Sequence, residues 1–369
     1  MALVFMAFAM PAALLGVIWP DVRIRFGQSL GTLGLVGLLY GAGRMSTCVS
    51  GRWLTARVGM GRAVSWSAGA LVIICALTAV APSWVLFLAA IVGLGMVSGT
   101  LDSLGATFLT RLGDVRQTGL IHGSYGIGST IGPAVAAVIG SWRVALAVTV
   151  AWSAVALGAV IRARDGWPAD HVAHPQTRVG AALPWQVVAV ALGLYTAFVG
   201  LEVTMGTWSH TYLTDQRGLS STWAAIGVSG FWGGMTVGRL SLSRHRVATW
   251  VGRLGLPIFA GLSLALMAPL ALLPAGCGVV TLLLLGLALS PVIPSLLSTT
   301  AARLGAAHAP KFAGYQLLAA NVGAIGAPSL TGALVSGVGP GVVILVCVAL
   351  AGCGLALLTR VEIPGSIVT

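Results

Sequence analysis

Residues 119–133 read GLIHGSYGIGSTIGP, and residues 314–328 read GYQLLAANVGAIGAP. At an offset of 195 residues, three identical residues coincide: Gly119 with Gly314, Gly128 with Gly323, and Pro133 with Pro328. Two further pairs recur at offsets of 187 and 192: Gly51-Arg52 with Gly238-Arg239, and Arg111-Leu112 with Arg303-Leu304. The pattern indicates that the chain consists of two duplicated halves. Parallel repeats of this kind are an architecture of membrane transporters.

The composition places most of the chain in lipid. Of the 369 residues, 57% are hydrophobic and 8% are charged, and the mean hydropathy is +0.98. A soluble domain carries about 25% charged residues, so this chain could not cover a water-exposed surface. The five cysteines all fall in apolar stretches without paired spacing, which favours small core residues over disulfides or metal ligands.

Twelve apolar runs reach the length of about 20 residues that a helix needs to cross a bilayer. They lie near residues 2–20, 30–51, 63–81, 84–109, 117–139, 142–161, 185–213, 221–241, 248–273, 276–302, 312–336 and 340–359. We therefore predict an all-α integral membrane protein whose twelve transmembrane helices form two pseudo-symmetric bundles. The longest polar stretch divides it into an N-terminal six-helix bundle (1–162), a cytoplasmic linker (163–184) and a C-terminal six-helix bundle (185–369).

The distribution of basic residues predicts the orientation. With the N-terminus inside, 15 Lys and Arg residues fall on the cytoplasmic side and four on the outer side. Cytoplasmic loops of membrane proteins are enriched in these residues, so both termini are predicted to be cytoplasmic in a multi-pass protein of the bacterial inner membrane. The net charge of +12 arises mostly from single arginines at the ends of apolar runs. That pattern excludes a basic stripe for nucleic acid.

Four segments carry a resemblance to a known family. They are GRWLTARVGMGR (51–62), TLDSLGA (100–106), VGLEVTMGTW (199–208) and GFWGGMTVGR (230–239). With them the chain resembles the major facilitator superfamily over essentially its whole length, and within it the fucose permease-like branch. The resemblance implies two six-helix bundles that work by alternating access.

The sequence departs from the family pattern at three positions. Ala56 replaces the usual Asp of the loop between helices 2 and 3, and Ala106 replaces an Asn in helix 4. The position of the acid that fucose permease carries in helix 1 falls near Gly16, so that acid is missing here. The resemblance also implies that contacts at the cytoplasmic ends of helices 2 and 8 close the inward side. On this basis Arg52, Arg57 and Arg239 are predicted gating residues.

Glu202 is an ionisable side chain within a predicted spanning helix. Such a residue costs at least about 2.5–3.5 kcal/mol at the bilayer centre and is by default functional. Glu202 lies midway between Trp185 and Asp215, which predicts a position near the midplane. We interpret it as a proton-coupling carboxylate; the alternative is a hydrogen bond to a neighbouring helix.

Asp102 and Arg44 form the second ionisable group. At 1.5 Å per residue they lie about 13 Å and about 12 Å from the cytoplasmic ends of their helices, which predicts similar depths in the same half. They could form a structural ion pair. Alternatively, Asp102 is a second proton-coupling carboxylate whose partner releases it when substrate binds, because a carboxylate withdrawn from water binds a proton more readily.

Uncharged polar and aromatic residues complete the predicted substrate site. Together with Arg44, the predicted substrate-binding residues are His122, Trp208, Trp232, Gln316 and Asn321. Indole rings can stack on a sugar or on an apolar ligand, and amides suit hydroxyl-bearing solutes. Packing roles are equally open for the tryptophans and the amides, and a capping role is open for His122 and for His210.

The sequence contains no nucleotide-binding loop and no cluster of metal ligands. We therefore predict no cofactor, no metal and no enzyme activity. The expected function is secondary active transport of a small solute, sugar-like or otherwise hydroxylated, with protons as the coupling ion. Its partners are then the substrate, protons and the lipid bilayer, with the protein acting as a monomer. The alternatives are proton-driven efflux of drugs or amphipathic compounds and, in another class, a non-transporting membrane receptor.

Overall fold

The computed structural model describes residues 1–112, 115–163, 167, 185–300 and 309–359, and the regular structure in these ranges is helical. The long helices of the first half are α1 (Ala2–Phe26), α2 (Leu33–Thr47), α4 (Met60–Val80), α5 (Trp84–Leu112), α6 (Val115–Ile139) and α7 (Trp142–Arg162). The second half contains the long helices α8 (Trp185–Thr211), α9 (Ser221–Ser241), α13 (Cys277–Leu289), α16 (Ala309–Val338) and α17 (Val342–Leu358) and the shorter helices α11 (Leu256–Ala265), α12 (Met267–Leu272) and α14 (Val292–Ser298).

Each of the twelve predicted runs contains helix, but three runs are broken. The run 30–51 divides at residues 48–49, between α2 and α3 (Ser50–Val58). Residues 256–272 divide into α11 and α12 ahead of Pro269, and residues 277–298 divide into α13 and α14 at Pro291. Proline lacks a backbone donor and its ring clashes with the carbonyl four residues earlier, which for Pro269 is Ala265, where α11 ends. At the break between α13 and α14 the residue before Pro291, Ser290, lies outside both helices, as proline favours for its predecessor. Among the described residues, seven helices are long and apolar enough to cross a membrane alone, and the count rises to eight if a bent pair is taken as one span. The count of twelve spans stays a prediction.

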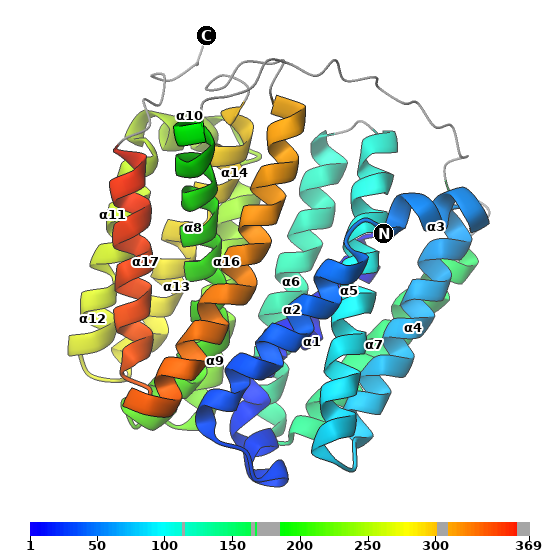
Figure 1. Ribbon diagram of the computed structural model, residues 1–369, viewed down its shortest axis with the longest axis horizontal. Helices are drawn as coiled ribbons and strands as arrows, with labels where there is room; N and C mark the ends of the chain where they lie inside the picture. The colour runs from blue at the N-terminus through cyan, green and yellow to red at the C-terminus, as the bar shows by residue number, and fades with distance from the viewer. Residues whose placement is uncertain (113–114, 164–166, 168–184, 301–308, 360–369) are drawn as a thin grey trace.

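Two short helices lie at the same end of the bundle: α3 (Ser50–Val58) and α10 (His245–Leu254) (Figure 1). The run 248–273, which was predicted as one span, contains a bend of 77° between α10 and the following helices α11 and α12. Each short helix ends at a glycine with positive φ, 81° at Gly59 and 79° at Gly255. Residues with a side chain rarely adopt this backbone conformation, so glycine permits the sharp change of direction at both positions.

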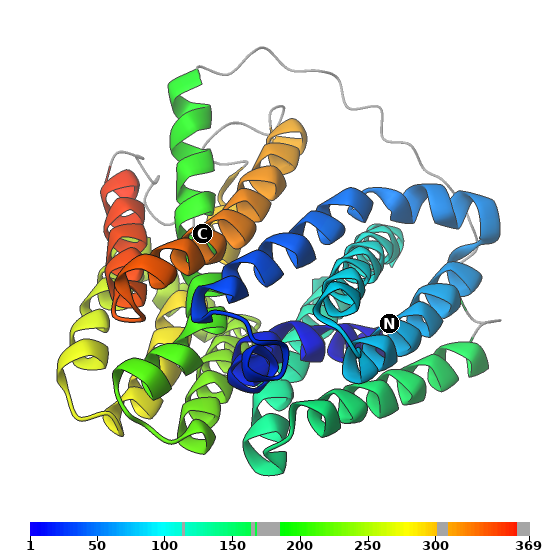
Figure 2. The same cartoon turned by 60° about the horizontal axis from the view of Figure 1, so that its bottom comes forward.

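The two halves repeat one pattern of helix packing. In the first half α1 packs on α6, α2 on α5, and α4 on α7. In the second half α8 packs on α16, α9 on α13, and α11 on α17. The halves meet through α6 with α9, α2 with α16, and α1 with α8 (Figure 2).

Glycines at two helix crossings give the register of the repeat. A Cβ added to Gly43 of α2 would lie 3.1 Å from the backbone nitrogen of Met96, and one added to Gly234 of α9 would lie 3.0 Å from that of Leu287. Gly95 and Gly286 occupy the reciprocal positions on α5 and α13, where the added Cβ would meet the nitrogens of Arg44 and Met235 at 3.0 Å. All these pairs are related by 191 residues. The offsets of 187 and 192 predicted for these helices are therefore replaced by one common value.

Candidate functional site

The first ion pair joins Arg44 of α2 to Asp102 of α5. The glycines at the α2–α5 crossing bring the two backbones together, so these charges face each other across adjacent helices. The side chains remain 31% and 29% exposed. The sequence-based prediction that they lie at similar depth is consistent with this contact.

An aromatic residue from a third helix completes the first cluster. The hydroxyl of Tyr125 on α6 accepts a hydrogen bond from Arg44, and the Tyr125 ring lies 5.5 Å from that of Phe8 on α1. The cluster therefore connects α1, α2, α5 and α6. Through Tyr125 the pair contacts α6, a helix that packs against the second half.

The second ion pair joins Arg239 of α9 to Glu202 of α8, where Arg239 Nη2 donates to Glu202 Oε2 at 2.8 Å. The side chains are 34% and 13% exposed, respectively. Gly206 packs against the indole of Trp232, so Glu202 lies one helical turn closer to the α10 end of the bundle than that contact. The long Arg239 side chain reaches back from the last turn of α9 to meet it.

A third ion pair connects the two halves. Arg23 Nη2 of α1 lies 3.7 Å from Asp215 Oδ2, which belongs to the π-helical turn Tyr212–Gln216 after α8. Closer packing accompanies it, because a Cβ added to Gly34 of α2 would lie 3.0 Å from the Cα of Gly332 on α16. The end of the bundle opposite α3 and α10 is thus closed by contacts between the halves.

The predicted substrate residues fall into different environments. Trp208 is completely buried, and its indole nitrogen donates to the Pro328 carbonyl at 3.0 Å, which is a packing contact between α8 and α16. Asn321 donates to the Leu317 carbonyl of its own helix at 2.9 Å. His122 belongs to α6, but its side chain lies outside the described residues.

Trp232 and Gln316 each keep a buried polar atom unpaired among the described residues. These atoms are the indole nitrogen of Trp232 and Oε1 of Gln316. The Gln316 amide nitrogen donates to Thr300 Oγ1 at 2.7 Å, which fixes the orientation of the amide. One buried donor and one buried acceptor therefore lack a partner in the described part of the chain.

The predicted gating arginines do not act as one group. Arg239 is held by Glu202, whereas Arg57 lies with its guanidinium 4.1 Å from the ring centroid of Trp53 on the same helix, α3. Arg52 is exposed on α3. A gating role for Arg52, Arg57 and Arg239 remains a prediction.

Other polar residues do not extend the site. His210 is buried, and its Nε2 lies 3.2 Å from Ser221 Oγ, which ties the end of α8 to the start of α9. In the described part of the chain, no group of three or more His, Cys, Asp or Glu side chains is placed to hold a metal ion.

Sequence reasoning missed the partners in two of the three ion pairs. Glu202 and Arg239 are 37 residues apart, and Arg23 and Asp215 belong to different halves. The available signal was that Glu202 needed a cation and that the next long helix, α9, holds Arg239. Nothing in the sequence singled out Tyr125.

Comparisons with known proteins agree with this architecture. The model of the Major Facilitator Superfamily matches residues 1–328. Among solved structures, the chain is similar to a bacterial homologue of the human lysosomal transporter Spinster, crystallised in an inward-facing and occupied conformation. The identity is 13% and the TM-score 0.69, over 98% of this chain and 92% of that one. No curated protein sequence matches. The resemblance to the fucose permease-like branch stays a prediction.

Proposed function

The chain belongs to the Major Facilitator Superfamily and is a multi-pass secondary transporter rather than an enzyme, and from this premise we propose that it couples a small hydroxylated solute to protons. The observation that carries the proposal is the presence of one carboxylate–arginine pair within each half, Asp102 with Arg44 and Glu202 with Arg239. All four side chains lie on long helices and keep some exposure.

The chemistry of the pairs links proton binding to solute binding. When a proton binds the carboxylate, its arginine loses an anionic partner, and the guanidinium N–H groups become available to a solute hydroxyl. When the proton leaves, the carboxylate competes again for the arginine and the solute is released. The site thus has two forms. In one, the carboxyl group is protonated and the arginine binds the solute; in the other, the carboxylate pairs with the arginine and the solute is absent.

The uncharged groups support a hydroxylated, sugar-like solute. The indole N–H of Trp232 donates and the Oε1 of Gln316 accepts. A polyol offers both functions at each hydroxyl, whereas an apolar compound would leave these buried atoms unpaired at a cost of about 1–3 kcal/mol each. This difference favours a hydroxylated solute over an amphipathic drug.

Alternating access requires that the two halves rock about the site. The Arg23–Asp215 contact and the Gly34–Gly332 approach support a form closed at the end opposite α3 and α10. The basic-residue distribution predicts that this is the outer end of a protein in the bacterial inner membrane. A proton gradient across that membrane would then drive the solute.

Counterflow in proteoliposomes with a mixed panel of sugars, polyols and amphipathic cations tests the proposal. We expect exchange of a hydroxylated solute, and accumulation of that solute when a pH gradient is imposed. Exchange without gradient-driven accumulation would contradict proton coupling. Exchange of amphipathic cations alone would contradict the solute class and favour efflux.

A further inference from the structure

The helix α10 has two chemically different faces. Val247, Val251 and Leu254 face the protein, and Val251 is 8% exposed within the main hydrophobic core. The opposite face carries two exposed arginines, Arg246 and Arg253. An amphipathic helix of this kind, with cations on its outer face, is suited to the surface of a bilayer.

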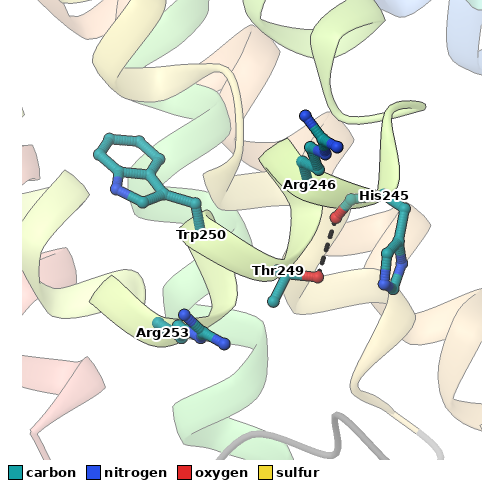
Figure 3. A pocket seen from close by; sticks show the side chains of 5 residues that line it. All are labelled: His245, Arg246, Thr249, Trp250 and Arg253. Atoms are coloured by element: carbon teal, nitrogen blue, oxygen red, sulfur yellow. Dashed lines mark hydrogen bonds between the residues drawn. The ribbon is translucent and has the colours of Figure 1, made fainter.

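This outer face forms a pocket of about 400 Å³, lined by His245, Arg246, Thr249, Trp250 and Arg253. Figure 3 shows the five side chains arranged along the helix, with Trp250 on one side and His245 on the other. The Thr249 hydroxyl donates to the His245 carbonyl at 2.8 Å. The pocket therefore carries two guanidinium groups and one indole ring, spread along the helix.

The arginines are available to a ligand. Among the described residues, neither Arg246 nor Arg253 forms an ion pair with a carboxylate. Trp250 is 57% exposed, although its ring lies 6.3 Å from that of Phe259 on α11. Tryptophan with neighbouring arginine is the residue combination that anchors a protein at the level of the lipid headgroups.

The position of α10 favours lipid over a soluble anion. α10 is bent by 77° from the apolar helices α11 and α12, which places it across the end of a predicted span. Lipid headgroups of the adjoining leaflet are then the anions present at the highest local concentration. The positive-inside distribution predicts the cytoplasmic leaflet, whose anionic lipids attract basic segments near the surface.

The first half carries a related helix. In α3, Arg57 lies two residues before Gly59, and in α10, Arg253 lies two residues before Gly255. Trp53 is 56% exposed, as Trp250 is 57% exposed. Both halves thus carry an exposed tryptophan about one helical turn before an arginine at the same end of the bundle.

We propose that the outer face of α10 binds the phosphate headgroup of an anionic phospholipid, with Arg246 and Arg253 holding the phosphate and Trp250 resting against the glycerol and upper acyl region. The proposal does not depend on the transported solute or on proton coupling. Its failure would leave the proposed transport function untouched.

Native mass spectrometry of the full-length, delipidated protein tests this site. The protein is titrated with phosphatidylglycerol, and separately with phosphatidylcholine of the same acyl chains. The test variant is Arg246→Gln with Arg253→Gln. Its matched control is Arg25→Gln with Arg143→Gln, which removes two exposed arginines from outside α10. Thermal unfolding of both variants verifies that they are folded.

At about 1 kcal/mol for each basic residue near an anionic lipid, the double variant should bind phosphatidylglycerol about 30-fold more weakly at its tightest site. Phosphatidylcholine binding should fall less, because its choline cation offsets the charge of its phosphate, and the control should keep the affinity of the parent. Trp250→Ala should weaken both lipids, because the indole contact does not depend on headgroup charge.

Three outcomes would overturn the proposal. Unchanged phosphatidylglycerol affinity in the test variant would remove α10 as the site. An equal loss in the control would reduce the effect to net charge. Displacement of the lipid by excess inorganic phosphate would identify a site for a free anion instead.

Discussion

Arg23 and Asp215 lie 3.7 Å apart and form an ion pair that joins the first half of the chain to the second. Asp215 also accepts a hydrogen bond from the Thr214 hydroxyl at 2.8 Å, which holds the carboxylate toward Arg23. In alternating access this contact must break when the opposite state forms. It therefore stabilises one of the two states selectively.

Asp215→Asn should shift the protein toward the state open at this end. Both side chains are about 30% exposed, so the pair contributes about 0.2–1 kcal/mol, or up to about a fivefold change in the ratio of states. Spin labels at the exposed residues Ile24 and Ser220, in a background without the native cysteines, would report the distance between the halves. Arg25→Gln is the control. The pair has no gating effect if the distance distribution is unchanged in Asp215→Asn.

Glu202→Gln should abolish accumulation driven by a pH gradient while solute exchange at equal pH remains measurable. The amide keeps the size of the side chain but cannot exchange the coupling proton. Arg239 stays 34% exposed, so it can be hydrated when its partner is neutral. Asp21→Asn, which neutralises an exposed carboxylate near the end of α1, is the matched control. Full accumulation by Glu202→Gln would exclude Glu202 as a proton carrier.

Opposite membrane sides are predicted for two exposed positions. Gln216 ends the turn after α8, and Ser243 precedes α10. Single cysteines introduced there should react with an impermeant reagent from the outside at Gln216 and from the inside at Ser243. Positions 165–175 in the predicted linker should behave like Ser243. Labelling of Gln216 from the cytoplasmic side would reverse the orientation.

The sequence was sufficient for the class of fold, because hydropathy alone requires helices that pack in lipid. It also located the three charges Arg44, Asp102 and Glu202, since an ionisable residue in an apolar run stands out. It did not locate their environment. The partner of Glu202 depends on how far α9 slides along α8, and that register depends on packing contacts such as Gly206 against Trp232. The lengths of apolar runs do not contain this information.

The same reason explains why the bend at α10 was not predicted. Residues 248–254 are apolar enough on average to extend the following span, but their apolar residues fall on one face. Gly255, with φ of 79°, then allows the chain to turn. A window average does not distinguish a helix that is apolar all round from one that is apolar on one face.

The glycine crossings predict paired effects on folding. Gly95→Ala and Gly286→Ala should destabilise the protein to a similar extent, because each new methyl group meets the backbone of a facing helix. Forcing extra volume into close packing costs about 1–3 kcal/mol. Gly37→Ala and Gly261→Ala are controls in which the added carbon meets nothing within 4 Å. Thermal unfolding in detergent measures all four. A large loss in only one half would show that the repeat does not share its packing constraints.

Asp102 and Arg44 distinguish a structural ion pair from a proton carrier. Asp102→Asn removes the carboxylate charge and leaves Arg44 with Tyr125 as its remaining partner among the contacts described above. Removing one member of a fully buried pair costs about 3–5 kcal/mol, and exposure near 30% should reduce that cost here. If the pair is structural, Asp102→Asn loses stability, and the double variant with Arg44→Gln recovers that stability. If Asp102 carries a proton, Asp102→Asn stays folded and exchanges solute, but it no longer accumulates solute under a pH gradient.

Unfolding temperature and vesicle transport measured on both single variants and on the double variant separate these cases. Normal stability together with normal accumulation in Asp102→Asn would exclude both roles, and Glu202 would then be the single remaining candidate for coupling.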